Sequence, residues 1–262
     1  TSYYVVGMKV RGGLDLPQKG TEQITVITGG VPAQYGDATG GIISVTTRGP
    51  SKQFSGGVEF VTSELFDEYG YNLASLDLSG PIFTKKDSTG QKSGQPVAGF
   101  FLSAEYQYDK DPSPSAAPFY VVKEDVLESA RKNPLILSPT GFGYIHRSSY
   151  YTMDSLEKVK ARPNVAANAA RLNGKIDIRP AKNVTLTMGG SIERTESRDY
   201  IDIYSLMNYD NNPQTIGTNW RAFAKLTQRF TSEAQEKAST GIKNAFYSIQ
   251  VDYSHGHSVD QN

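Results

Sequence analysis

The chain has 262 residues, with 27 Lys and Arg against 27 Asp and Glu, and no cysteine. Zero net charge argues against a nucleic-acid-binding protein, which normally carries a strongly basic patch. The absence of cysteine excludes disulfides, thiolate-bound zinc and a thiol nucleophile. No apolar run of about 18 residues occurs, so no membrane-spanning helix is predicted. The mean hydropathy of −0.45 still allows a membrane β-barrel, because its strands alternate lipid-facing and lumen-facing residues.

The first fifty residues contain short apolar stretches separated by glycine-rich turns. Residues 3–10 are typical of an interrupted strand, and residues 1–12 lack the charged start and apolar core of a signal peptide. Two further apolar stretches, 24–28 and 41–47, flank a segment rich in Gly and Pro. This pattern predicts two buried strands around a short helical turn.

After Pro50 the sequence changes to long runs that alternate apolar and polar residues. Residues 184–193 are the clearest case, with Val184, Leu186, Met188 and Ile192 on one face and Thr185, Thr187, Ser191 and Glu193 on the other. Such sustained period-two alternation predicts half-buried antiparallel strands. Seven are predicted, near residues 54–64, 70–82, 97–108, 168–179, 184–196, 218–230 and 243–255.

The connections between these strands differ in length. Residues 180–183 form a tight turn, whereas 109–165 and 197–217 are long, and strand parity places both long connections on the opposite side from that turn. The first long connection includes a predicted helix over 122–132, with acidic residues at its start and basic residues at its end, as the helix dipole favours. Short turns on one side and long loops on the other are typical of outer-membrane barrels.

Alternation alone fits two architectures. In a soluble sandwich the apolar faces pack on each other, and in a membrane barrel they face lipid. Strand length favours the barrel, because about 9–11 tilted residues are needed to cross a bilayer. Small residues on the apolar face also favour the barrel, among them Ala74, Ala104, Gly174 and Gly190. Aromatic residues near the strand ends favour it too, among them Tyr106, Trp220 and Tyr253.

Residues 22–49 have an ordered set of features: an acidic residue, a strand, a Gly-Gly turn, a Tyr-Gly pair, a Gly-Gly step and a strand ending in Arg-Gly. This order resembles the end of the plug domain of TonB-dependent outer-membrane receptors, most closely the large SusC/RagA-like type. The preceding strand departs from the family pattern, with Val6-Gly7 where Asp-Gly is usual. Gly29, Gly36 and Gly40 are candidates for positive φ. The resemblance assigns a structural motif to Glu22, Gly29, Gly30, Tyr35, Gly36, Gly40, Gly41 and Arg48.

The resemblance implies an all-β fold: a transmembrane antiparallel β-barrel, 22-stranded in the family, around an α+β plug domain. Residues 1–50 would be the C-terminal part of the plug domain. Residues 51–262 would be the first barrel strands, with long extracellular loops at 109–165 and 197–217. Seven strands cannot close such a barrel, and an open edge would leave backbone groups unpaired in lipid. We therefore expect a fragment of a longer multi-pass protein of the cell outer membrane.

The implied function is import of a nutrient (an oligosaccharide, a peptide or a chelate) by energised displacement of the plug. A TonB-type energiser would act through a segment upstream of residue 1, and the strands would contact the lipid bilayer. The alternative is a plugged barrel that serves as a structural or docking subunit of a larger outer-membrane complex. A surface lipoprotein lid or other outer-membrane subunits are the expected partners, and no nucleic acid is expected.

Tyrosines in the long connections are candidates for extracellular ligand or partner contacts: Tyr150, Tyr151, Tyr200, Tyr204 and Tyr209. His255 and His257 share one face of a strand, but no carboxylate lies at ligand spacing, so no metal is expected. The sequence has no Gly-x-Ser-x-Gly elbow and no convergent catalytic set. An enzyme is therefore not expected, and neither is a cofactor.

Overall fold

The structure is a computed structural model that describes residues 2–10, 16–32, 35, 40–86, 92–181, 183–230 and 245–261. Of the predicted motif residues, Gly36 lies outside these ranges. Among the residues described, no helix is both long enough and apolar enough to cross a membrane.

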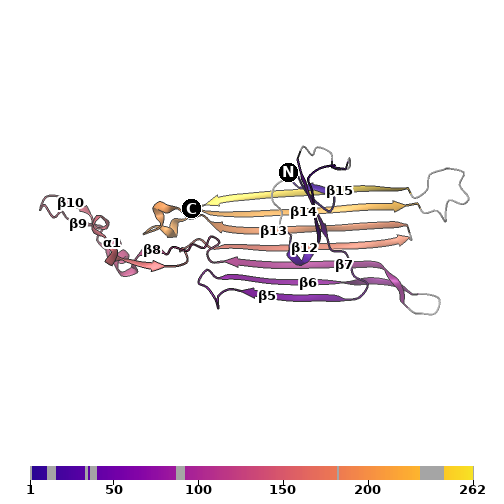
Figure 1. Cartoon of the computed structure of the whole chain (residues 1–262), viewed down its shortest axis with the longest axis horizontal. Coiled ribbons are helices and arrows are strands. Elements are labelled where there is room, and N and C mark those ends of the chain that lie inside the picture. The colour runs from indigo at the N-terminus through magenta and orange to yellow at the C-terminus, as the bar shows by residue number, and fades with distance from the viewer. Residues whose placement is uncertain are drawn as a thin grey trace, which may run out of the picture.

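The largest element is a seven-stranded antiparallel sheet (Figure 1). Its strand order is β15-β14-β13-β12-β7-β6-β5, so each strand pairs with the sheet strand that precedes or follows it in the chain. The predicted all-β fold with seven antiparallel strands is confirmed. The strands are β5 (Ser55–Thr62), β6 (Tyr71–Lys86), β7 (Lys92–Asp109), β12 (Ala167–Ala181), β13 (Val184–Arg198), β14 (Gln214–Arg229) and β15 (Phe246–Gln261).

Several strands are longer than the alternation predicts. β14 begins at Gln214 rather than at 218, because Gln214 pairs with Arg198 on one side and Gln261 on the other. The second long connection is therefore 199–213, and the prediction of 197–217 is too wide at both ends. β15 likewise continues past 255 to Gln261, where the alternation gives no apolar signal.

Register places like residues side by side across the sheet. Leu172 lies between Ala104 and Ile192, which in turn pairs with Trp220, and these side chains share one face. Arg171 lies between Glu105 and Glu193 on the opposite face. The sheet therefore has an apolar face and a polar face, as the period-two pattern predicts. Trp220 lies well inside β14 rather than near its end, which corrects its predicted position.

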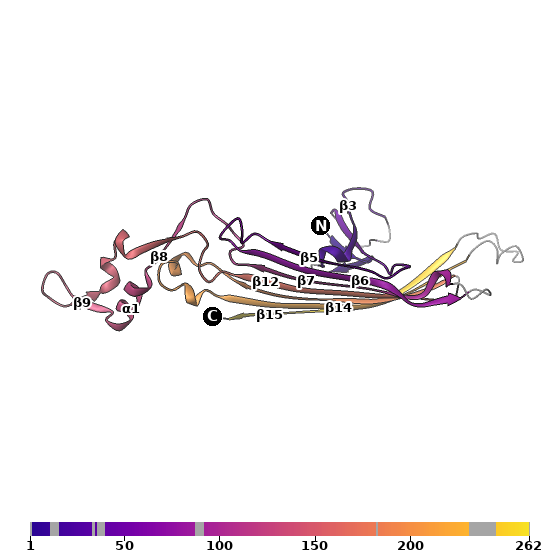
Figure 2. The ribbon, with the colours of Figure 1, turned by 90° about the horizontal axis from the view of Figure 1, so that it is seen from below.

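The N-terminal part forms a separate four-stranded sheet of order β2-β1-β4-β3. Figure 2 shows this sheet lying over one face of the seven-stranded sheet. Its centre buries Tyr4, Val5, Ile42 and Val45, and β1 runs parallel to β4. The elements are β1 (Ser2–Val5), β2 (Met8–Val10), the 3-10 turn η1 (Gln18–Gly20), β3 (Thr21–Ile27) and β4 (Ile42–Thr47).

The long connections fold into a head beyond one end of the seven-stranded sheet (Figures 1 and 2). Its helix begins at Glu124 rather than at 122, because Val121 and Val122 belong to a strand pair instead. The elements are β8 (Phe119–Val122), α1 (Glu124–Lys132), β9 (Leu135–Leu137), β10 (Tyr144–His146), η2 (Arg147–Tyr150), η3 (Met153–Ser155), β11 (Leu156–Val159), η4 (Asp202–Tyr204) and η5 (Tyr209–Asn211).

Candidate functional site

The polar face of the seven-stranded sheet contacts the N-terminal sheet through long cationic side chains. Arg221 Nη2 donates to the backbone oxygen of Val5 at 3.2 Å. Lys175 Nζ donates to the backbone oxygen of Thr47 at 2.9 Å. These bonds reach the C-terminal ends of β1 and β4, the two central strands of the N-terminal sheet, and hold that end against the seven-stranded sheet. We call this contact the seam.

A buried charge network lies beside the seam. Arg171 donates from Nη1 to Glu105 Oε1 at 2.9 Å and from Nε to Glu193 Oε1 at 3.2 Å. The second oxygen of Glu105 accepts from the backbone N–H of Gln18 at 3.0 Å. One guanidinium therefore serves two buried carboxylates, and one of these carboxylates anchors the start of η1. Removing Arg171 would take this counter-ion from two buried carboxylates at once, which is strongly destabilising.

Gly20, the last residue of η1, lies close against the seven-stranded sheet. A Cβ at this position would lie 2.7 Å from Ser103 Oγ and 3.3 Å from Asn173 Nδ2. Both of those side chains are buried, and within the described part of the chain neither polar atom has a hydrogen-bond partner. The seam is thus tightly packed and polar, and part of its hydrogen-bonding capacity is unused.

Three motif residues belong to the edge strand β3 or to the turn that follows it: Glu22, Gly29 and Gly30. Glu22 is exposed and is the extra residue of a β-bulge, since pairing with β4 shifts between Thr21 and Gln23. Gly30 has a φ of +62°, whereas the φ of Gly29 is not in the left-handed region. The prediction of positive φ at Gly29 is therefore wrong. Of the two glycines after β3, the second therefore has the left-handed backbone.

The remaining motif residues lie near the start and end of β4. The Tyr35 ring packs edge-on against Tyr4 at a centroid distance of 4.9 Å. Gly40 is exposed, and the carbonyl of Gly41 accepts from the N–H of Ser2 at 2.9 Å. Arg48 exposes its side chain while its backbone N–H donates to the Gly20 carbonyl at 3.0 Å. These residues support the small sheet, and their role in a plug stays a prediction.

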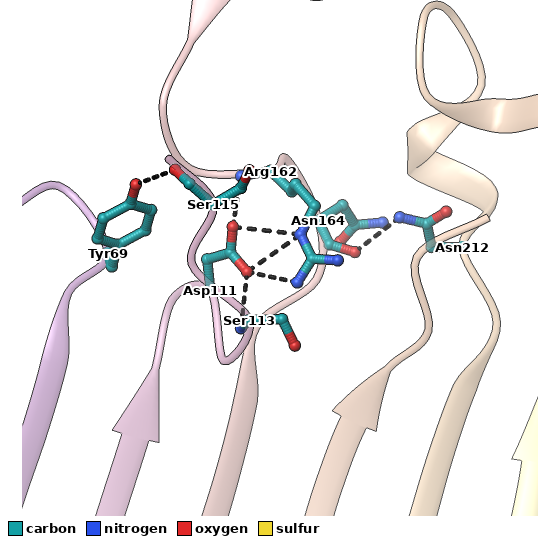
Figure 3. Close-up of polar contacts among 7 residues, drawn as sticks. All are labelled: Tyr69, Asp111, Ser113, Ser115, Arg162, Asn164 and Asn212. Atoms are coloured by element: carbon teal, nitrogen blue, oxygen red, sulfur yellow. Dashed lines mark hydrogen bonds and ion pairs between the residues drawn. The ribbon is translucent and has the colours of Figure 1, made fainter. Parts of the chain in front are cut away.

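A second polar cluster holds the head together (Figure 3). The Asp111 carboxylate is fully buried and binds the Arg162 guanidinium, with Nη2 at 2.6 Å and Nε at 3.1 Å from Oδ1. Backbone N–H groups of Ser113 and Arg162 donate to the same carboxylate at 3.1 and 2.9 Å. We call this set the clamp, because it joins the two ends of the 110–166 connection.

The clamp also joins neighbouring connections. The Tyr69 hydroxyl, from the β5–β6 turn, donates to the carbonyl of Ser115 at 2.8 Å. Asn164 Nδ2 donates to the carbonyl of Tyr209 at 2.8 Å, and Asn212 Nδ2 returns a bond to the Asn164 carbonyl at 3.0 Å. Three connections are thereby joined to one another beside the clamp.

Two opposing effects act on the Asp111 carboxyl. Its burial raises the pKa, because desolvation penalises the charged form. The hydrogen bonds from the Arg162 side chain and from the backbone N–H groups of Arg162 and Ser113 lower the pKa by more. The net pKa lies below the ordinary value, so this carboxyl is ionised at neutral pH.

The candidate tyrosines lie in both long connections of the head, 110–166 and 199–213. Tyr200 contacts the clamp, with the Arg162 guanidinium 4.9 Å from its ring centre. Tyr209 contributes its carbonyl to Asn164, and the Tyr151 hydroxyl donates to the Val126 carbonyl. Tyr204 is half-buried in η4, while Tyr150 is half exposed. A ligand-binding role for these residues stays a prediction.

Sequence reasoning missed both polar clusters. Asp111 and Arg162 are separated by 51 positions, and nothing in their local sequence relates them. The Arg171 network does leave a signal, because charged residues occupy the polar phase of three alternating strands. The phase alone does not give register, so the pairing of Arg171 with Glu105 and Glu193 could not be derived.

No family model matches the chain, and no curated protein matches it. Among solved structures, the ferripyoverdine receptor of the outer membrane of Pseudomonas aeruginosa is 13% identical, with a TM-score of 0.49 over 87% of this chain and 25% of that one. The siderophore receptor PiuA from Acinetobacter baumannii is 15% identical, with a TM-score of 0.44 over 99% and 38%. The ferric-catecholate import receptor Fiu from E. coli is 13% identical, with a TM-score of 0.43 over 100% and 43%. The chain therefore spans less than half the length of each of these receptors.

Proposed function

We propose that this chain supplies the C-terminal part of a plug domain and seven barrel strands of an outer-membrane transporter of the TonB-dependent type. The observation that carries the proposal is the seam. A small N-terminal sheet is held by polar contacts against the polar face of an amphipathic antiparallel sheet. β3 and β4 of that sheet contain the two ends of the plug-like motif over residues 22–49.

The apolar face has the dimensions that a membrane wall needs. In β13 the residues on this face are apolar or glycine from Val184 to Ile192, and Arg194 follows on the same face. Eight residue steps at ~3.3 Å give about 26 Å along the strand. At a strand tilt of about 40° this corresponds to a band about 20 Å tall, comparable with the ~25 Å band of membrane barrels.

The chemistry of the seam supports a displaceable N-terminal domain. Its bonds are polar and would exchange for bonds to water on separation, so each has a net cost of about 1.5–3 kcal/mol, the range for a hydrogen bond to a charged group. Ser103 and Asn173 would gain partners from water when the seam opens. An apolar interface of the same size would instead lose about 25 cal/mol for every Å² exposed.

In this proposal the 110–166 and 199–213 connections face outward and the short turn at 182–183 faces the periplasm. Energy would reach the N-terminal sheet from the periplasmic side through a TonB-type partner. Iron chelates, oligosaccharides and peptides are the substrate classes to screen, and the SusC/RagA-like subtype stays a prediction.

An engineered disulfide tests whether the seam must open. The Cβ position of Gly20 lies 3.8 Å from the Cβ of Ser103, inside the ~3.5–4.5 Å range of disulfides. The 262 residues contain no cysteine. Gly20→Cys with Ser103→Cys, made in the full-length protein in its host, should stop substrate-dependent growth when oxidised and restore it after reduction.

Each single cysteine variant is the matched control and should not respond to reductant. Uptake that continues at the wild-type rate with the disulfide fully formed would refute transport by displacement at this seam. The same result would favour the alternative, a permanently plugged barrel that serves as a docking subunit. The joined connections of the head support that alternative, since a docking surface needs a fixed shape.

A further inference from the structure

A shallow groove of about 600 Å³ crosses the apolar face of the seven-stranded sheet from β5 to β13. Short and long side chains are adjacent in it, since Tyr106 on β7 lies between Ala74 on β6 and Ala170 on β12. The groove is therefore the space that alanines leave beside larger side chains. The other apolar residues that line it are Val58, Phe60, Leu76, Ala104, Leu172 and Ile192.

One cation lines the β13 end of this groove. Arg194 lies two positions after Ile192 and therefore on the same face of the sheet. Its side chain is exposed, and among the residues that the structure describes its guanidinium has no hydrogen bond and no ion pair. The next residue on this face of β13, Glu196, accepts a bond from Gln214 Nε2 instead. Arg194 is thus a free cation at the end of an apolar groove.

Strand pairing places seven residues in one row across the apolar face at the level of Arg194. Thr218 pairs with Arg194, and His257 pairs with Thr218. The row contains no carboxylate, so Arg194 carries its only permanent charge. A hydroxyl and an imidazole beside a guanidinium can all donate hydrogen bonds to one anion. The full row is Phe60, Ala74, Tyr106, Ala170, Arg194, Thr218 and His257.

The position of Arg194 fits the headgroup level of a bilayer. This inference rests on the proposed function, because it takes the apolar face to be in contact with lipid. β13 runs outward from the turn at 182–183, so Arg194 lies at the outward end of the apolar band. An arginine there can lay its stem along apolar surface and place its guanidinium among headgroups. A guanidinium binds phosphate through two parallel hydrogen bonds.

The length of the groove fits a hydrocarbon chain. Five neighbouring strands at a spacing of ~4.8 Å give about 19 Å from β5 to β13. One leaflet contributes about half of the ~30 Å hydrocarbon core, or about 15 Å. An acyl chain that is inclined in its leaflet can therefore lie along the groove while its headgroup stays at Arg194.

We propose that the groove and Arg194 form a binding site for one lipid with an anionic phosphate headgroup. The phosphate binds the guanidinium, and an acyl chain covers Ala170 and the alanines beyond it. A free phosphate would leave the apolar groove unfilled. A zwitterionic lipid would bring a second positive charge close to Arg194, which disfavours it.

Native mass spectrometry of the full-length protein in detergent tests the site with three probes: phosphatidylglycerol, phosphatidylcholine and inorganic phosphate. We expect one phosphatidylglycerol to be retained per chain, with at least about tenfold weaker retention of phosphatidylcholine. Arg194→Gln should weaken phosphatidylglycerol binding about 10- to 100-fold, because a hydrogen bond to a charged group is lost. Arg229→Gln is the matched control, since Arg229 is exposed and lies on the polar face of β14.

A second variant fills the groove without changing charge. Ala170→Leu should reduce phosphatidylglycerol retention, whereas Ala224→Leu should not, because Ala224 lies on the same face between Met188 and Val251, outside the groove. Equal retention of both lipids, displacement by inorganic phosphate, or retention unchanged by Arg194→Gln or Ala170→Leu would overturn the proposal.

A photo-crosslinking amino acid at position 224, in the native membrane, separates this inference from the proposed function. Crosslinks to lipid at 224 are expected if the apolar face contacts the bilayer. Their absence would refute the membrane-spanning sheet itself. Crosslinks to lipid at 224 without a preference for phosphatidylglycerol in the wild-type protein would refute only the site at Arg194.

Discussion

Replacement of Asp111 by alanine should loosen the head from the seven-stranded sheet while leaving the sheet itself folded. The carboxylate is completely buried, and it accepts bonds from the Arg162 side chain and from two backbone N–H groups. Without it, a guanidinium that is only 13% exposed loses its counter-ion. The backbone donors of Ser113 and Arg162 lose their acceptor at the same time.

The expected magnitude follows from the cost of breaking a buried ion pair on one side, ~3–5 kcal/mol. Since ~1.4 kcal/mol corresponds to a factor of ten, the opening equilibrium of the head should rise about 10²- to 10³-fold. The change should be local, because the clamp lies outside the strands and contacts only the connections.

Hydrogen exchange of the full chain in detergent measures this opening directly. Amides of β8 and β11 should exchange about 10²- to 10³-fold faster in Asp111→Ala, while amides of β12 and β13 should not change. Asp210→Ala is the matched control, because that carboxylate is 67% exposed and lies 3.5 Å from Arg131. An exposed pair of this kind is worth at most ~1 kcal/mol.

Two results would refute the reasoning. One is an exchange rate in Asp111→Ala within about threefold of the wild type, which would mean that the clamp contributes little. The other is exchange as fast as that of Asp111→Ala in the double variant Asp111→Leu with Arg162→Met. No buried charge is left unpaired in this double variant. This variant should recover most of the lost protection, because replacing a buried pair by apolar residues is often close to neutral.

Two further outcomes are expected. Val6 has a φ of +52°, which costs a non-glycine residue ~1–2 kcal/mol. Asn tolerates this conformation, so Val6→Asn should slow exchange of the β1–β2 hairpin amides about 5- to 30-fold, and unchanged or faster exchange would contradict the argument. Because the pKa of Asp111 is lowered in the folded head, its contribution is complete above the unfolded value of ~3.9. That contribution should be lost as pH falls through the lower folded pKa. Pulsed pepsin digestion between pH 4.5 and 2 should detect this loss, and Asp111→Asn should abolish the dependence.

The seven-stranded sheet was predictable because its signal is local. From Val184 to Glu193 the alternation of apolar and polar residues indicates which face of the sheet each side chain occupies. The same holds in β12 and β14, which pair with this strand. The ends of strands were less predictable. Gln214 belongs to β14 only because Arg198 and Gln261 lie beside it, and neither neighbour is encoded near position 214.

The polar clusters depend on tertiary packing and were not predictable. Val122 is predicted to be the first residue of the helix, yet it pairs with Leu156 in a strand and is buried. Asp111 belongs to a Pro- and Ser-rich stretch that indicates only a turn, and its partner Arg162 follows a long excursion. Such a pair forms only when the strands at both ends of the 110–166 connection lie side by side, so the local sequence does not indicate it.

The strand order has a consequence for assembly. Five of the six strand pairings in the sheet join strands linked by at most 16 residues, so these pairs could form one after another as hairpins. Loop closure costs ~0.6 kcal/mol more for each doubling of length, so the β7–β12 pairing, which spans residues 110–166, should form last. The three strands β5–β6–β7 and the four strands β12–β13–β14–β15 would then be two preassembled blocks, and Arg171 lies on the strand where they meet. Because that residue lies opposite Glu105, its charge would select the correct register at the moment the blocks join.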